Sequence, residues 1–299
     1  MTHYRLAVTL LIAATVLWGS TFSFTKVLVA AIPPMYLLAH RFLLASFLVF
    51  LICPRTIISE FPRGIRDKHL LIFSLVSIGA IGLQTYGIQF TTASNAGFIT
   101  AFSVVLVPIL KRLHYKTGLS RQIYLAITVA LSGLYMISFG LTIPQSMNRG
   151  DFLVFLCALL YGYYIVILEI VVRTFSGATA MFFSFGLTSI VCFILGALLE
   201  THPTVGTMLS GSVMLNLLAL VVLGSVAAYL LMAWGQKHVK AEIAGLIYAL
   251  EPIFALIIAW IFLRESLTPW QMVGAGLVML ALIVGIRHSQ VELQTRRDP

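Results

Sequence analysis

A carboxylate beside a proline interrupts one of the most apolar stretches of the chain. Glu251-Pro252 lies near the middle of the run from Ile243 to Arg264. A charged side chain at that depth costs about 2.5–3.5 kcal/mol on insertion scales, and the proline removes a backbone donor. A membrane helix usually keeps such a pair beside a polar cavity, where Glu251 can bind a proton or an amine. The alternative is a kinked helix in which Glu251 is hydrogen-bonded inside the bundle.

Further polar and aromatic side chains lie near the middle of apolar runs. At about 1.5 Å per helical residue, Glu251 lies roughly 15 Å deep, and Tyr248 lies on the same helix face. Tryptophan usually marks the ends of membrane spans, so Trp18 in mid-span is unusual. Aromatic rings and hydroxyls could hold an amphipathic metabolite, with aromatic core packing as the alternative. The candidate cavity residues are Trp18, Thr21, Gln84, Thr100, Ser103, Tyr161, Tyr164, Tyr248 and Glu251.

Two residues join Glu251 as candidates for coupling or gating. Pro252 weakens its helix and favours a bend. Arg41 lies about 9 Å inside its run and could attract a substrate carboxylate. It could also pair with Asp151 or Glu265, and this structural or gating pair is the interpretation that we favour.

Charged residues near the ends of the apolar runs have ordinary explanations. Lys26 lies near an interface, and its long side chain can extend its amine to water. Glu169 precedes Arg173 by four residues, which is the spacing of a helical ion pair. We therefore expect neither residue to belong to the cavity.

The composition is that of a polytopic membrane protein. Of 299 residues, 60% are hydrophobic and 10% are charged, whereas soluble domains carry about a quarter charged residues. The three cysteines have neither metal-ligand nor disulfide spacing, and the sequence contains no His-Glu-x-x-His, P-loop or nucleophile-elbow motif. We therefore predict no enzyme activity, no cofactor and no metal. The first apolar run is too long for a signal peptide, so we expect it to be retained.

Ten apolar runs are long enough to cross a bilayer as helices. Prolines or polar residues separate most of them. The predicted spans are Leu6–Ala30, Met35–Cys53, Leu70–Phe90, Asn95–Leu113, Ile123–Leu141, Phe152–Val172, Thr179–Leu199, Val213–Gln236, Ala241–Leu263 and Trp270–Ile286. The fold class is thus an all-α integral membrane protein with ten transmembrane helices.

The basic residues predict the orientation of these spans. Most of the nineteen lysines and arginines fall in alternate loops and the two terminal segments, with Arg149 and Arg264 as the exceptions outside the spans. Since cytoplasmic loops carry the excess of basic residues, both termini are predicted to be cytoplasmic, in the inner (plasma) membrane. The net charge of +9 is then explained by the basic residues that orient the spans in the membrane. We therefore expect the partner to be the lipid bilayer and not a nucleic acid.

The chain also repeats itself. At a shift of 148 residues Gly97 meets Gly245, and at a shift of 143 residues Trp18-Gly19 meets Tyr161-Gly162. Each copy holds five spans, an odd number, so the second copy must insert upside down. We divide the chain into repeats at 6–141 and 150–286 and a cytoplasmic tail at 287–299. Two inverted repeats are a recurrent plan of transporters, whose site lies between them near the midplane.

With this plan, the sequence resembles the EamA family of the drug/metabolite transporter superfamily over nearly its whole length. The resemblance implies two tandem EamA repeats in a ten-helix inverted-repeat fold, and movement of small metabolites such as amino acids, frequently outward. The matching residues are Trp18-Gly19-Ser20-Thr21-Phe22, Lys26, Pro34, Arg41, Gly150-Asp151, Leu250-Glu251-Pro252-Ile253-Phe254-Ala255, Leu263-Arg264-Glu265-Ser266-Leu267 and Gly274.

The first repeat departs from the pattern of the second. Ser103 and Val104 stand where the second repeat has Glu251 and Pro252. Any coupling through a carboxylate therefore belongs to the second half alone.

The sequence predicts a secondary transporter that exports small organic metabolites, amino acids or related amphipathic compounds, by alternating access. Proton coupling through Glu251 is a hypothesis, and the oligomeric state stays open. Two alternatives remain, an integral-membrane enzyme that acts on a lipid or prenyl substrate and a membrane scaffold without transport. The enzyme would need clustered Asp, His or Arg at one interface, whereas the predicted outer loops are nearly bare of them.

Overall fold

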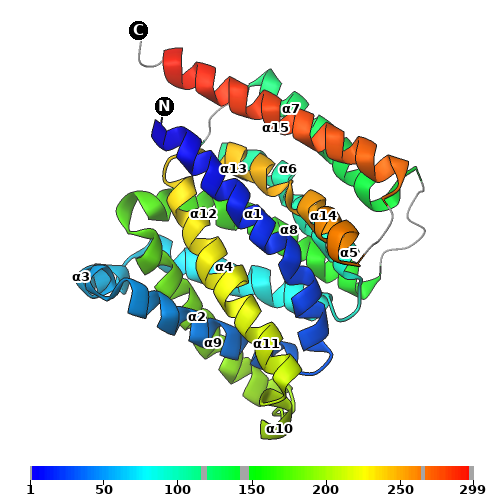
Figure 1. The fold of residues 1–299 in the computed structure, drawn as a ribbon. Coiled ribbons are helices and arrows are strands. Elements are labelled where there is room, and N and C mark those ends of the chain that lie inside the picture. Colours follow the sequence, from blue (N-terminus) through cyan, green and yellow to red (C-terminus); the bar gives the residue numbers. More distant parts are fainter. Residues whose placement is uncertain (1, 116–119, 142–147, 264–266, 296–299) are drawn as a thin grey trace.

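The computed structural model describes residues 2–115, 120–141, 148–263 and 267–295. These residues contain helices and no strands, and ten helical segments are long and apolar enough to cross a bilayer. The predicted ten-span helical fold is confirmed, with span ends shifted by a few residues. Both ends of the chain lie at one face of the bundle, called the terminal face below, and the other is called the opposite face (Figure 1).

Two of the ten spans consist of two helices each, and a third contains a π-helical segment. The spans of the first half are α1 (Thr2–Val29), α2 (Pro34–Ile52), α4 (Lys68–Gly87), α5 (Ala93–Ala101) with α6 (Ser103–Tyr115), and α7 (Arg121–Phe139). Those of the second half are α8 (Arg149–Thr174), α9 (Gly177–Leu199), α11 (Gly211–Ala219) with η1 (Leu220–Ala227) and α12 (Ala228–Gln236), α13 (Ala241–Tyr248) with α14 (Glu251–Leu263), and α15 (Pro269–Thr295). Two shorter helices are α3 (Pro54–Gly64) and α10 (Val205–Met208).

The packing of the spans follows the repeat. Helix α4, in the third span of the first half, packs along α8, the first span of the second half. In the same way the η1–α12 segment, in the third span of the second half, packs along α1, the first span of the first half. Helices α2 and α9, which occupy equivalent places, pack on each other, as do α7 and α15. Because each half has five spans, equivalent helices run in opposite directions. The halves are therefore interleaved, and a space at the centre is lined by both.

Polar side chains at helix starts satisfy the free backbone N–H groups there. The Asp67 carboxylate accepts hydrogen bonds from the amides of His69 and Leu70 at the start of α4, both at 2.9 Å. Asn148 and Asp151 form a reciprocal capping box at the start of α8. These caps fix where the spans begin and therefore which residues reach mid-depth.

The fourth span of each half is broken near its middle. In the second half α13 ends at Tyr248 and α14 begins at Glu251, so the helix is interrupted beside Pro252, where the sequence predicts a local weakening. Pro252 lies in the first turn of α14, where its missing N–H costs little. In the first half α5 and α6 are separated at Phe102, although no proline stands there. A polar residue follows each break, Ser103 at the start of α6 and Glu251 at the start of α14.

Helices α7 and α15 pack closely through two glycines. A Cβ atom added to Gly274 would lie 2.5 Å from the carbonyl oxygen of Gly133, and one added to Gly133 would lie 2.6 Å from that of Gly274. Small residues at such a crossing let two membrane helices approach each other. The pair lies along one edge of the bundle (Figure 1).

Replacing Gly274 with alanine is expected to lower the stability of the folded protein by about 1–3 kcal/mol, because the two backbones must separate. Gly276→Ala is the matched control, since a Cβ atom there would meet no atom within 4 Å. The control is expected to be neutral or slightly stabilising, because alanine is the better helix former. Thermal unfolding in detergent measures both, and equal melting temperatures would contradict this account of the crossing.

Candidate functional site

A cavity lined by residues of both halves lies inside the bundle. All nine candidate cavity residues line it, and so does Arg41. Pro252 is buried and lies outside the lining. The other lining residues are Phe22, Thr25, Ile81, Ile88, Ala101, Ile165, Tyr229 and Met232.

Two opposite charges line this cavity, one from each half. Among its lining residues in the described part of the chain, Arg41 of α2 and Glu251 of α14 are the only ones with formally charged side chains. Arg41 is buried, with an exposed fraction of 7%, and Glu251 is half-buried. Neither forms an ion pair with a described residue. The cavity therefore presents a basic and an acidic side chain for which the described residues supply no counter-ion.

A π-helical segment positions the arginine. The Arg41 Nε atom donates to the Ser225 hydroxyl at 2.8 Å, and the Trp18 Nε1 atom donates to the carbonyl oxygen of Gly224 at 3.1 Å. Both acceptors belong to η1, where the helical hydrogen-bond register changes. π-helical turns occur frequently at functional sites. Here the segment supplies acceptors to two cavity residues from two other helices.

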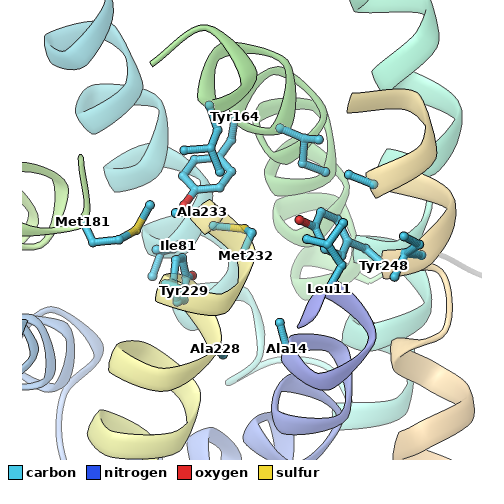
Figure 2. Close-up of a cluster of buried hydrophobic side chains, with 14 of the residues drawn as sticks. Leu11, Ala14, Ile81, Tyr164, Met181, Ala228, Tyr229, Met232, Ala233 and Tyr248 are labelled. Carbon is cyan, nitrogen blue, oxygen red and sulfur yellow. The ribbon is translucent and has the colours of Figure 1, made fainter. Parts of the chain in front are cut away.

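Four of the six aromatic residues that line the cavity lie close to one another. The ring centroid of Trp18 lies 5.1 Å from that of Tyr229 and 5.5 Å from that of Tyr248, both edge-on. Figure 2 shows Tyr164 of α8, Tyr229 of α12 and Tyr248 of α13 in one cluster, with Met232 beside them. Such a cluster suits an apolar group or, through the ring faces, an amine.

Hydroxyl and amide groups complete the lining. Gln84 donates to the Thr100 hydroxyl at 3.0 Å, which links α4 to α5. The Tyr161 and Tyr229 hydroxyls lie 3.2 Å apart. Towards the terminal face, the Tyr248 hydroxyl donates to Gln236 at 3.2 Å. These bonds hold the polar atoms in place at the depth of Glu251.

A cluster of four charged residues lies between the cavity and the terminal face. The Lys111 amine lies 2.8 Å from Glu169 and 2.6 Å from Glu242. Arg173 lies 2.6 Å from Glu169, so the helical pair predicted for these two is confirmed. The cluster joins α6 of the first half to α8 and α13 of the second. It ties the halves together at this end of the cavity.

Polar contacts at the opposite face, one of which joins the two halves, correct two expectations. The Lys26 amine donates to the carbonyl oxygens of Ile88 at 2.6 Å and Thr91 at 2.7 Å, so it closes the end of α4 instead of reaching for water. Asp151 accepts from the Thr91 hydroxyl at 2.5 Å. The expected pairing of Arg41 with Asp151 is therefore wrong, because Asp151 is held by Thr91 and by its own helix cap. The other expected partner of Arg41, at position 265, lies outside the described residues.

Sequence reasoning missed Tyr229 and Ser225. Both lie inside the span predicted at Val213–Gln236. A serine and a tyrosine near the middle of an apolar run could have indicated that this helix also faces the cavity. The sequence also does not predict the contact between Lys111 and Glu242, because these residues lie 131 positions apart on different helices.

The fold and the cavity define a class of protein, a membrane transporter with two five-span halves around a central site. The chain matches the model of the EamA-like transporter family twice, at residues 5–139 and 148–286, and it belongs to this family. The resemblance seen in the sequence is thus confirmed.

Similar proteins agree with this class. An uncharacterized transporter of Archaeoglobus fulgidus is 32% identical over 90% of this chain and 82% of its own length. The uncharacterized transporter YoaV of Bacillus subtilis is 22% identical over 92% of this chain and 94% of its own length. A solved crystal structure of a protein superposes with a TM-score of 0.74 over 94% of this chain and 98% of its own, at 16% identity, and shows the same fold.

Proposed function

We propose that this chain is a secondary transporter that exports amino acids or related small amphipathic compounds across the inner (plasma) membrane. The observation that carries the proposal is a basic and an acidic side chain, Arg41 and Glu251, that line one aromatic cavity without a counter-ion among the described residues. An amino acid presents a carboxylate, an amine and a side chain. Arg41 would bind the carboxylate with charge-assisted hydrogen bonds, Glu251 and the ring faces would attract the amine, and the aromatic cluster would hold an apolar side chain.

The two ends of the cavity support transport by alternating access. Polar contacts tie the halves together at both faces, around Lys111 at the terminal face and between Thr91 and Asp151 at the opposite face. Transport would loosen one set at a time as the halves rock about the central site. A substrate that bridges Arg41 of the first half and Glu251 of the second would favour a state in which both are close to it.

The side of the membrane and the direction of transport rest on the sequence. The basic loops favour a cytoplasmic terminal face, and bacterial and archaeal relatives fit an inner or plasma membrane. Export is the direction that the resemblance implies. Proton coupling would use Glu251, the lining carboxylate, whose proton a substrate amine would displace.

Purified protein in liposomes tests the function by counterflow of radiolabelled amino acids and small amphipathic amines. At least one amino acid is expected to exchange faster than in protein-free liposomes, and a compound with both a carboxylate and an amine is expected to compete better than one with either alone. Absence of protein-dependent flux for the whole panel would contradict the proposal.

Replacing Glu251 with glutamine tests the coupling. Since glutamine cannot ionise, uphill accumulation driven by a pH gradient is expected to be lost, while exchange at equal pH is reduced less. Accumulation and exchange in the same liposomes measure the two effects. Glu200→Gln is the control, because Glu200 is a half-buried carboxylate away from the cavity. Gradient-driven accumulation that stays unchanged in Glu251→Gln would rule out the coupling role.

A further inference from the structure

The short helix α3 presents an apolar face outside the bundle. Ile58, Phe61 and Ile65 have exposed fractions of 62%, 41% and 65%. Their spacing of three and four residues places them along one side of the helical path. Figure 1 shows α3 at the left edge of the bundle, where it connects the end of α2 with the start of α4. This connection lies at the terminal face.

The other side of α3 is fixed to the second half of the protein. Glu60 accepts hydrogen bonds from the backbone N–H and the hydroxyl of Ser176, both at 3.0 Å. Arg63 donates to the carbonyl oxygen of Thr174 at 3.2 Å. Ile57 is buried, with an exposed fraction of 1%. These contacts set the rotation of α3 about its axis, so Ile58 and Ile65 are directed away from the bundle, while the partly exposed Phe61 ring stacks on Phe183 of α9 at 5.2 Å.

Basic side chains flank this apolar face. Arg55, Arg66 and Lys68 are exposed, and within the described ranges none of them forms an ion pair. The two acidic residues of the segment are engaged elsewhere, since Glu60 binds Ser176 and Asp67 caps α4. The segment therefore keeps three positive charges for an external partner.

The inverted repeat supplies an internal comparison. The equivalent connection of the second half, between α9 and α11, lies at the opposite face and contains α10, with four residues. Residues 200–210 include no lysine or arginine. The equivalent connection thus contains no basic amphipathic helix, although both halves share one plan.

We propose that α3 lies in the headgroup layer of the leaflet at the terminal face and binds anionic lipid. Ile58, Phe61 and Ile65 would reach the acyl chains, and Arg55, Arg66 and Lys68 would contact headgroup phosphates. A helix with an apolar face and basic flanks suits this position, and each basic residue strengthens attraction to anionic lipid. The site is independent of the cavity, so it can be tested without a known substrate.

Lipid binding to the full-length protein in detergent tests the proposal. Phosphatidylglycerol and phosphatidylcholine with the same acyl chains are titrated, and bound lipid is counted by native mass spectrometry. The wild-type protein is expected to prefer phosphatidylglycerol, and the variant R55Q/R66Q/K68Q to bind it at least roughly tenfold more weakly. The control R121Q/K237Q/R287Q removes the same charge from three exposed positions in separate segments and is expected to keep the preference. Equal loss in the two variants, or no loss in either, would overturn the proposal.

Spin labels test the depth of the apolar face. A label at Ile58→Cys in liposomes that contain phosphatidylglycerol is expected to be more accessible to oxygen than to a water-soluble nickel chelate. A label at Ser59→Cys, the adjacent exposed position towards the polar side, should show the reverse. Cys53 is half-buried and would be replaced with serine in both proteins. Equal nickel accessibility at the two positions would show that the face does not enter the lipid.

Discussion

Replacing Arg41 with glutamine is expected to slow amino-acid counterflow roughly tenfold to a hundredfold without loss of the fold. A hydrogen bond to a charged group contributes about 1.5–3 kcal/mol, which corresponds to this range in affinity. Arg41 is buried without an ion-pair partner among the described residues, so its own charge costs free energy in the folded state. We therefore expect the variant to melt at the same or a higher temperature than the wild type.

The controls for Arg41 separate recognition from structure. Arg287→Gln removes an exposed arginine near the chain end and is expected to leave counterflow unchanged. Arg41→Lys keeps the charge but loses the planar fork that matches a carboxylate, so we expect partial activity. Amines without a carboxylate should be transported equally by Arg41→Gln and the wild type. If these amines slow as much as amino acids do, Arg41 shapes the cavity and does not recognise the carboxylate.

Replacing Lys111 with methionine is expected to destabilise the protein by about 3–5 kcal/mol. The change leaves Glu169 and Glu242, with side-chain exposed fractions of 5% and 13%, without their shared cation. Removal of one partner of a buried ion pair costs this much because the other charge stays buried. Glu169 keeps Arg173, so most of the penalty falls on Glu242. Thermal unfolding in detergent measures the loss.

Neighbouring residues supply the controls for Lys111. Arg112→Met removes the adjacent cation, which is exposed and contacts the Tyr124 hydroxyl, and it is expected to cost little. The double variant Lys111→Met/Glu242→Gln should recover part of the lost stability, because the buried carboxylate of Glu242 that lost its partner is replaced by a neutral amide. A melting temperature of Lys111→Met equal to that of Arg112→Met would show that the cluster does not hold the halves together.

Much of the fold could be predicted because few backbone structures are stable in the hydrocarbon core of a bilayer. A chain that crosses hydrocarbon must satisfy its backbone hydrogen bonds internally, so apolar runs of about twenty residues indicate helices directly. Depth follows from the helical rise, and this is why Trp18, Gln84, Tyr161 and Glu251 could be placed at one level.

The pairings across the bundle could not be predicted in the same way. They depend on which faces of distant helices meet, as with Arg41 and Ser225, which are 184 residues apart. Lys26 likewise donates to a backbone carbonyl oxygen at the end of α4. Every residue type carries such an oxygen, so the sequence does not indicate this partner. The helix α3 was missed for another reason. Its segment stands out in the sequence for its charges, although the spacing of Ile58, Phe61 and Ile65 indicates an amphipathic helix.

The closely packed pair of α7 and α15 has a consequence for engineering. No described residue of either helix lines the cavity, and the glycine crossing joins the two helices along one edge. Changes that strengthen this edge can therefore raise the heat resistance of the protein without altering which solutes it accepts. The same edge offers attachment points for fluorescent probes or fiducial tags that leave the permeation route untouched.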